Sequence, residues 1–349
     1  MGGCSALFSP QKPNRRPRFG SRTTALEVCE HADLKGKTAL VTGGNAGIGK
    51  ETVRALYAAG ADIILCCRHV ASGEQVAKEL TTGKNNIHVC QLDLSDLCSV
   101  DACVAHVKET FTCLDIVILN AGCVSKTLKK TAQGFEEVFG VNFVSQYYLT
   151  THLLDMMKNP GCRIVGVSST AHWMGKIVLD DLNFEERSYS GFQSYAQSKL
   201  CMLLYMKYLA LKFEKDSIDN IKVFSVHPGA IRTQLVDNTT WTRLGFALFG
   251  LFCKTPEQGA ACTVFAATLC EEKNGTYLED CHAGFMARQG RDLDMAEKLI
   301  QVTDLEIRKR HSVSRNNTMM QSAQANNHEP NIQKSLPRTA TISLHAQIL

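Results

Sequence analysis

The sequence predicts an α/β fold in which a doubly wound parallel sheet carries helices on both faces and forms a single domain. Short apolar runs with the length of buried strands alternate with segments of helical periodicity along most of the 349 residues. Strands joined by helices of about 10 to 20 residues imply right-handed crossovers and parallel pairing. In such a sheet, ligands bind at the carboxyl ends of the strands. The pattern therefore predicts the edge of the sheet that carries a site.

The chain divides into four predicted segments. Residues 35–290 carry the alternating strand and helix pattern and are expected to form the domain. Residues 1–34 lack periodicity and are predicted to be an N-terminal tail. Residues 291–311 place apolar side chains on one helical face and predict a C-terminal amphipathic helix. Residues 312–349 are rich in Ser, Asn and Gln, which predicts a disordered tail.

The composition suits a globular protein of the cytoplasm, with 44% hydrophobic and 21% charged residues. The net charge of +4 is small for this length and predicts no nucleic-acid partner. No run of about 18 apolar residues occurs, so no membrane-spanning helix is expected. The 15 cysteines lack metal-ligand spacing, which favours free thiols in a reducing compartment and predicts no metal site.

Two segments are candidates for peripheral contact with a membrane. Gly2 is an acyl acceptor and Cys4 could take a second chain, although Ala6 stands where the lipidation pattern requires Ser or Thr. Basic residues within 12–18 would add attraction to anionic lipids. Residues 241–252 are rich in Phe, Leu and Trp and suit a lid over an apolar pocket or a helix at a membrane surface. An unmodified tail and ordinary core packing are the respective alternatives.

A glycine-rich turn after the first strand predicts a Rossmann-type dinucleotide site. The strand at 38–42, a helix and the strand at 62–67 lie within about 30 residues, which is the context that such a site requires. The turn contains Gly43, Gly47 and Gly49, whose spacing differs from G-x-G-x-x-G. Glycines permit the tight turn and let a pyrophosphate approach backbone N–H groups at the helix start. A purely structural turn is the alternative.

The end of the second strand indicates NADP(H) as the cofactor. An NAD site places a carboxylate there, whereas an NADP site offers an arginine. Cys67 holds the carboxylate position and Arg68 follows it. No acid repels a 2′-phosphate, and a guanidinium can pair with it. NAD is the less favoured cofactor. The alternative is that Arg68 is an ordinary exposed arginine that leaves the choice between NADP and NAD undecided.

Tyr195 and Lys199 lie four residues apart in the predicted helix 194–213, so they share one helical face. A nearby positive charge lowers the pKa of a tyrosine from about 10 towards neutrality. This pairing suits a group that takes a proton from an alcohol or gives one to a carbonyl near pH 7. The alternative is that Tyr195 and Lys199 are ordinary side chains of a helix without a catalytic role.

Further polar groups and glycines follow the predicted strands 87–92, 115–119, 163–167 and 222–226 or lie on the predicted helix 135–157. They are Asp93, Asn120, Gly122, Ser169, Pro228, Gly229 and, on the helix, Asn142. These positions put them at the same edge of the sheet as the glycine turn.

Over about residues 35–290 the chain resembles the short-chain dehydrogenase/reductase superfamily, and within it the branch of the retinol dehydrogenases and the WW-domain-containing oxidoreductase, without WW domains. The motifs that carry the resemblance are Thr42-Gly43-x-x-x-Gly47-Ile48-Gly49, Asp93, Asn120-Ala121-Gly122, Asn142, Ser169, Tyr195-x-x-x-Lys199 and Pro228-Gly229-x-x-x-Thr233. Val226-His227-Pro228-Gly229 is similar to the retinol dehydrogenase branch. Leu119 departs from the pattern, because the family usually has an asparagine there.

The resemblance implies a catalytic set of four residues. Tyr195 would be the general acid/base, and Lys199 would hold the nicotinamide ribose and lower the pKa of the tyrosine. Ser169 would polarise the substrate oxygen. Asn142 would hold a water that relays protons to Lys199.

The resemblance also implies the cofactor contacts. Gly43, Asn45 and Ile48 would lie along the pyrophosphate, with Gly47 and Gly49 shaping the turn. The remaining expected contacts are Asp93 at the adenine, Asn120 supporting the cofactor-side strand, Thr233 at the carboxamide, and Arg68, Gly122, Pro228 and Gly229.

The predicted function is NADP(H)-dependent interconversion of a hydrophobic alcohol and its aldehyde or ketone, such as a retinoid, a steroid or a lipid aldehyde. The alternative is a cofactor-binding interaction protein with little turnover. A hydrolase with Ser169, His172 and His227 is disfavoured, because residues 166–170 lack the second glycine of a nucleophile turn. A homodimer is left open.

Overall fold

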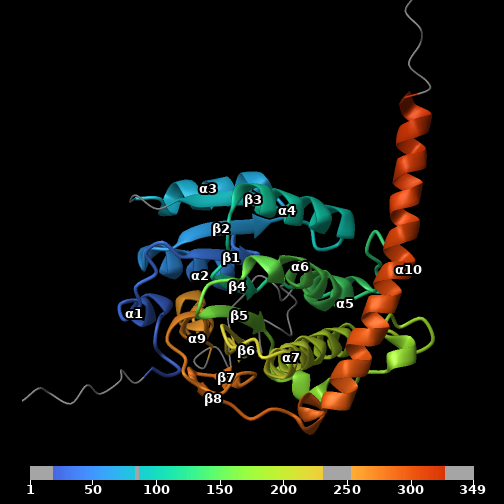
Figure 1. Cartoon of the computed structure of the whole chain (residues 1–349). Coiled ribbons are helices and arrows are strands. Elements are labelled where there is room, and N and C mark those ends of the chain that lie inside the picture. Colours follow the sequence, from blue (N-terminus) through green and yellow to red (C-terminus); the bar gives the residue numbers. More distant parts are fainter. Residues whose placement is uncertain (1–18, 83–85, 231–252, 327–349) are drawn as a thin grey trace, which may run out of the picture.

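One sheet of eight strands forms the middle layer of the molecule. The computed structural model describes residues 19–82, 86–230 and 253–326 (Figure 1). The strands are β1 (Thr38–Thr42), β2 (Asp62–Cys67), β3 (Ile87–Gln91), β4 (Ile116–Leu119), β5 (Cys162–Val167), β6 (Ile221–His227), β7 (Tyr277–Glu279) and β8 (His282–Ala283). Their order is β3-β2-β1-β4-β5-β6-β7-β8, with parallel pairing up to β7 and an antiparallel β8 at the edge.

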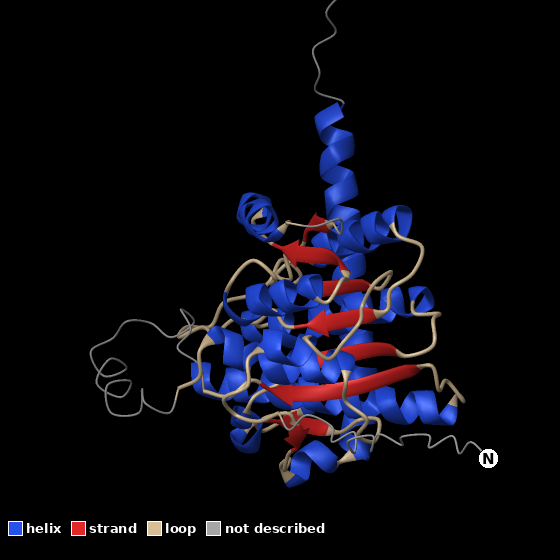
Figure 2. Cartoon of the chain, turned by 90° about the vertical axis from the view of Figure 1, so that its left-hand side faces the viewer, coloured by secondary structure: helices blue, strands red, loops and turns tan. Residues whose placement is uncertain are grey.

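This order confirms the predicted doubly wound fold. The chain builds β1, β2 and β3 towards one edge and then returns to place β4 on the other side of β1. The reversal creates a switch point between β1 and β4, where ligands bind in open α/β sheets. Figure 2 shows the strands side by side with helices around them.

Helices cover both faces of the sheet. The α-helices are α1 (Ala25–Cys29), α2 (Gly47–Ala58), α3 (Val70–Leu80), α4 (Leu97–Thr110), α5 (Glu137–Phe139), α6 (Ser145–Leu153), α7 (Gly191–Lys215), α9 (Pro256–Thr268) and α10 (Leu293–Asn326). The shorter turns are η1 (Gly140–Val144), η2 (Leu154–Met156), η3 (Thr170–Met174), η4 (Leu179–Asp181) and η6 (Arg288–Arg291).

Two apolar cores result, one on each face of the sheet. In β1, Leu40 packs with the α4, α6, α7 and α10 side, whereas Ala39 and Val41 pack with the α1, α2 and α9 side. Alternating side chains of a strand point to opposite faces, so a strand covered on both faces must be apolar throughout. This is why the predicted strands read as continuous apolar runs.

The N-terminal boundary requires a correction, because the predicted tail 1–34 contains α1. Thr24 accepts a hydrogen bond from the Glu27 backbone N–H, and the Glu27 carboxylate accepts one from the Thr24 N–H at 2.6 Å. This reciprocal capping box satisfies two backbone donors of a short helix. Val28 and Cys29 are buried in the core shared with α9.

The C-terminal boundary also differs from the prediction. The expected helix 291–311 is present, but α10 continues to Asn326 into the segment that was expected to be disordered. The first part of α10 docks on the domain, with Leu299 and Ile300 buried. A docked helix is already nucleated. Extending it by one residue therefore loses less conformational entropy per hydrogen bond than starting a new helix does. The Met, Gln and Ala residues of its last turns have good helix propensity.

Three thiols converge in a way that the sequence spacing does not reveal. Cys66 of β2 and Cys90 of β3 are neighbours in register, and Cys103 of α4 covers them, with the three sulfur atoms within 4.8 Å of one another. All three side chains are buried. Hydrogen bonding to Cys103 and burial raise the pKa of the Cys66 thiol. The three thiols therefore pack as small side chains in the core on this face of the sheet.

No helix among the described residues is long and apolar enough to span a membrane. Gly2 and Cys4, the predicted lid at 241–252 and Thr233 all lie outside the described residues.

Candidate active site

The turn between β1 and α2 is shaped by glycines at the carboxyl end of β1. Gly43 and Gly47 have φ angles of +66° and +51°, a region that side chains with a Cβ adopt only with strain. A Cβ on Gly49 would lie 2.1 Å from the Gly43 carbonyl oxygen. Ala46 is the N-cap of α2 and provides no side-chain hydrogen bond. The first N–H groups of α2 are therefore available to an anionic ligand.

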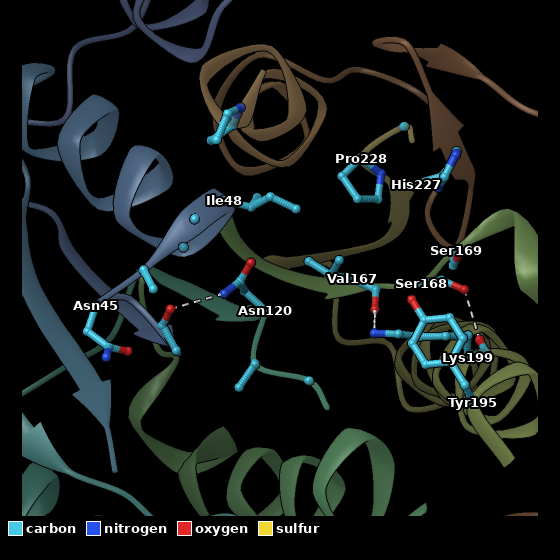
Figure 3. A pocket seen from close by; sticks show the side chains of 18 residues that line it. Asn45, Ile48, Asn120, Val167, Ser168, Ser169, Tyr195, Lys199, His227 and Pro228 are labelled. Atoms are coloured by element: carbon cyan, nitrogen blue, oxygen red, sulfur yellow. Dashed lines mark hydrogen bonds between the residues drawn. The ribbon is translucent and has the colours of Figure 1, made fainter. Parts of the chain in front are cut away.

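A cavity of about 660 Å³ opens beside this turn, at the carboxyl ends of β1, β4, β5 and β6. Most of the predicted site residues line it (Figure 3). They are Gly43, Asn45, Gly47, Ile48, Gly49, Asn120, Gly122, Ser169, Tyr195, Lys199, Pro228 and Gly229. The glycine turn, the uncapped helix start and the adjoining cavity fit a dinucleotide.

Tyr195 and Lys199 extend from α7 towards the end of β5 (Figure 3). The Lys199 Nζ donates a hydrogen bond to the Val167 carbonyl at 2.9 Å and lies 5.6 Å from the centre of the Tyr195 ring. Ser169 lies two residues after the end of β5, and its side chain interacts with the Tyr195 phenol. The strand end and the helix thus bring a phenol, a hydroxyl and an ammonium into one cavity.

The expected low pKa of Tyr195 is wrong for this state of the protein. Burial raises the pKa of the phenol, and the interaction with the Ser169 side chain only partly opposes this shift. Burial also lowers the pKa of Lys199 to about 8. The positive charge of Lys199 favours the phenolate, but the loss of water around both groups disfavours either charged form.

Asn142 lies behind the cavity wall, in a π-helical turn that interrupts the predicted helix 135–157. Its Nδ2 donates to the Cys123 carbonyl and to the Ser198 hydroxyl, both at 3.0 Å, and its Oδ1 accepts from the Cys123 N–H at 2.7 Å. A Cβ on Gly122 would lie 3.3 Å from Asn142 Oδ1 and 3.4 Å from Lys199 Nζ. Gly122 therefore leaves room between the amide and the ammonium.

Asn120 connects two strands beneath the cavity. Its Nδ2 donates to the Thr42 carbonyl at 2.9 Å, and its backbone N–H donates to the Thr42 hydroxyl at 2.9 Å. These bonds hold the ends of β1 and β4 together at the switch point. Asn45 also lines the cavity, and its amide donates to the Ser72 hydroxyl at the start of α3.

Two predicted cofactor residues lie outside the cavity lining. Arg68 is exposed at the end of β2, and its Nε is 3.3 Å from His69 Nε2. Asp93 follows β3, and its Oδ1 accepts hydrogen bonds from the N–H and hydroxyl of Ser95. The strand β2 ends at Cys67, which is a buried cysteine, so no carboxylate stands where an NAD site carries one.

The predicted site residues do not include six others of the cavity wall, namely Ala46, Ala121, Val167, Ser168, His227 and Pro256. The position of His227 at the end of β6 could have identified it. Its Nδ1 is buried without a hydrogen-bond partner among the described residues. Burial lowers the pKa of His227 to about 4, so the ring is neutral at physiological pH.

The geometry does not support a serine hydrolase. His172 Nδ1 is 2.5 Å from the Ser169 carbonyl oxygen, and its Nε2 accepts a hydrogen bond from the Ala287 N–H. Both ring nitrogens are therefore engaged with the backbone. The hydroxyl of the neighbouring Ser168 donates to the Lys199 carbonyl.

Comparison with known proteins decides the family. A family model described as short chain dehydrogenase matches residues 37–243. The chain belongs to this family. Retinol dehydrogenase 11 of Homo sapiens is 38% identical over 275 residues, which cover 77% of this chain and 85% of that protein. The WW domain-containing oxidoreductase of Drosophila melanogaster is 35% identical over 291 residues, which cover 78% and 70% of the two chains.

Solved structures support the same assignment. A crystal structure of an uncharacterised protein from Mycobacterium paratuberculosis superposes with a TM-score of 0.68 at 27% identity and covers 80% of this chain and 97% of its own. A blue fluorescent protein from a metagenomic library, solved in complex with NADPH, has a TM-score of 0.59 at 25% identity. The superposition covers 73% of this chain and 100% of that protein. This short chain dehydrogenase is an oxidoreductase, and the fold of its family binds a nicotinamide cofactor.

Proposed function

We propose that this short chain dehydrogenase uses NADP(H) to interconvert a hydrophobic alcohol and its aldehyde or ketone, with Tyr195 as general acid/base. The observation that carries the proposal is the convergence of Tyr195, Ser169 and Lys199 in the cavity that also contains the glycine turn. An interaction protein without turnover has no need of this set beside a dinucleotide site.

The glycine turn at Gly43, Gly47 and Gly49 would hold the dinucleotide, whose nicotinamide would supply a hydride to the substrate carbon or accept one from it. Ser169 and Tyr195 bind the substrate oxygen. In oxidation the Tyr195 oxygen takes the alcohol proton, and in reduction the phenol returns one to the carbonyl oxygen. Lys199, whose pKa is about 8, is largely protonated at neutral pH and stabilises the phenolate that forms beside it. Asn142 hydrogen-bonds the Cys123 backbone and the Ser198 hydroxyl beside Lys199, and it would hold a water that relays protons to Lys199.

The preference for NADP(H) rests on Arg68, which is exposed after β2 without a neighbouring carboxylate at position 67. We expect the protein to bind NADPH more tightly than NADH. Arg68→Ala should narrow this difference by about 1–3 kcal/mol, the usual worth of a hydrogen bond to a charged group. Isothermal titration with both cofactors measures the effect. Arg308→Ala, at an exposed position on α10, is the matched control and should leave the difference intact.

Equal affinities of the parent protein for NADPH and NADH would overturn the assignment of the cofactor. A preserved preference in Arg68→Ala would instead show that other groups bind the 2′-phosphate.

The substrate class follows from the relatives, since the curated retinol dehydrogenases act, by name, on a lipophilic alcohol. Retinoids, steroids and aliphatic aldehydes should each be tested for turnover with NADP(H) and NAD(H). Turnover of one of these classes supports the enzyme. Binding of cofactor without turnover of any of them would favour the interaction protein.

A peripheral membrane location is part of this proposal, with the rest of the protein in the cytoplasm. A lipophilic substrate partitions into membranes, and Gly2 together with Cys4 would supply an anchor. Membrane fractionation of Gly2→Ala tests it. If the variant partitions to membranes as the parent does, acylation of Gly2 does not anchor the protein.

A further inference from the structure

Glu136 is a buried carboxylate that the reaction described above does not use. Its side chain has no exposed surface. Oε1 accepts hydrogen bonds from the Val138 N–H at 3.0 Å and from the Tyr189 hydroxyl at 3.3 Å. Oε2 accepts from the Phe139 N–H at 2.8 Å and from the Ser194 hydroxyl at 2.8 Å.

These four bonds join two elements that carry the proposed site. The Val138 and Phe139 N–H groups open the short helix α5, which leads directly into the π-turn that contains Asn142. Ser194 precedes Tyr195 on α7. The Glu136 carboxylate therefore connects α5, which leads into the turn of Asn142, to Ser194, which precedes Tyr195.

The carboxylate is itself held in a fixed place. The Glu136 backbone N–H donates to the Asn183 Oδ1 at 2.9 Å, and the ion pairs among the described residues do not include Glu136. A buried carboxylate without an ion pair is tolerated when its lone pairs are filled by hydrogen bonds. The positions of the four donors thus determine where this group can lie.

The Ser194 contact is the link that matters between the two elements. The Tyr189 hydroxyl is shared with the Ser125 carbonyl at 3.1 Å, so its bond to Glu136 is the weaker of the two side-chain bonds. A carboxylate accepts at both oxygens, whereas a glutamine amide would turn an N–H₂ group against a backbone N–H. Only the acid satisfies all four donors.

We propose that Glu136 is a positioning residue that acts through the Ser194 hydroxyl. It sets the distance between the Asn142 turn and Tyr195 on α7. The inference rests on the proposed function, because it assigns a role in the reaction of Tyr195.

The sharpest variant is Ser194→Ala, which removes the link to α7 but leaves Glu136 and both backbone bonds of α5 in place. We expect kcat to fall about 10- to 100-fold, the cost of a small misplacement of reacting groups. The KM for NADPH should stay near the parental value, and the pH profile of kcat should shift. Ser190→Ala is the matched control, because it removes the N-cap hydroxyl of the same helix without touching Glu136, and thermal unfolding reports the cost of the lost cap. The Ser190 hydroxyl accepts from the Gln193 N–H and has no contact with Glu136, so kcat should not change.

Glu136→Gln and the double variant with Ser194→Ala give a second measurement. Both changes break the same hydrogen bond, so their effects on kcat should be far from additive. Thermal unfolding of each variant separates lost activity from lost folding. If Glu136→Gln does not fold, Ser194→Ala still decides the question.

The tyrosine ring-carbon resonance of Tyr195 provides a readout that needs no turnover. It should shift in Ser194→Ala and stay unchanged in Ser190→Ala. A parent protein without turnover would overturn the proposed function while this resonance still tests the positioning. An active parent, with parental kcat, pH profile and Tyr195 resonance in Ser194→Ala, would overturn the role of Glu136.

Discussion

Lys199 carries its charge inside the protein with a single described hydrogen bond, to the Val167 carbonyl. The side chain is almost fully buried, and burial lowers its pKa to about 8. Loss of hydration destabilises the ammonium more than the neutral amine. The folded protein therefore maintains a group that changes charge just above physiological pH, beside the phenol that we assign to proton transfer.

This burial predicts a rise in stability at alkaline pH. The unfolded chain has the ordinary lysine pKa of 10.5, so between pH 8 and 10.5 it binds more protons than the folded protein, and the free energy of unfolding rises with pH. Below pH 8 both states are protonated and the penalty is constant. Lys199→Met should remove a rise on the order of 3 kcal/mol relative to the parent. Urea unfolding from pH 7.5 to 10.5 measures it, with the exposed Lys298→Met as control. Parallel curves for the parent and Lys199→Met would contradict the buried charge.

Two capped helices stabilise the outer layer behind the cofactor turn. α1 and α9 both begin with a capping box, at Thr24 and Thr255, and they pack against each other. The Gln258 side chain donates to the Arg22 carbonyl at 3.2 Å and joins the two helix starts. The segment before β1 is thus part of the domain.

Thr24→Ala should lower the free energy of unfolding by about 1 kcal/mol, the typical cost of removing an N-cap oxygen. Thr24→Ser retains that oxygen and should stay close to the parent. Chemical denaturation of the two variants makes the comparison. Equal stability of Thr24→Ala and the parent would mean that α1 adds nothing to the fold.

At the scale of the whole molecule, α10 runs beside α5 and α7 and extends past the domain (Figure 1). The Tyr147 hydroxyl of α6 donates to the Asp304 carboxylate at 2.6 Å, and His311 Nε2 lies 2.8 Å from the Asp101 carboxylate of α4. Buried side chains such as Leu299 accompany these polar contacts. The helix is therefore docked through its first half, on the side of the sheet that carries α7.

Tyr147→Phe should lower the free energy of unfolding by about 1.5–3 kcal/mol, the worth of a hydrogen bond to a charged group. It should leave the KM for the cofactor unchanged, because neither Tyr147 nor Asp304 lines the cavity. Thermal unfolding and steady-state kinetics measure both effects. Tyr208→Phe on α7 is the control. A loss of activity without a loss of stability would place α10 in the reaction rather than in the scaffold.

The sequence predicted the sheet well because its strands are buried on both faces and read as apolar runs between glycine-rich or polar turns. The strand at 38–42 was predicted with the bounds that β1 has. Most site residues were predictable because they follow such strands. The same rule puts His227 at the end of the predicted strand 222–226, although it is not among the predicted site residues.

The errors have identifiable physical causes. α1 was missed because its signal is a capping box of Thr24 and Glu27 rather than a long periodicity. Asn142 lies in a π-turn and bonds to Cys123 and Ser198, which are 19 and 56 residues away in sequence, so a local pattern does not report its surroundings. The pKa of Tyr195 depends on burial, which residue spacing does not report. Local patterns therefore predicted the elements, and tertiary contacts decided the rest.

The most direct test of the proposed chemistry is the turnover of Tyr195→Phe with NADPH and the best substrate from the screen, together with its affinity for NADPH. Phenylalanine keeps the ring and removes the hydroxyl that exchanges the proton. We expect turnover to fall about 10²- to 10⁴-fold, the usual contribution of a general acid/base, while the Kd for NADPH stays close to that of the parent. A variant that binds NADPH and turns over at nearly the parental rate would contradict the account.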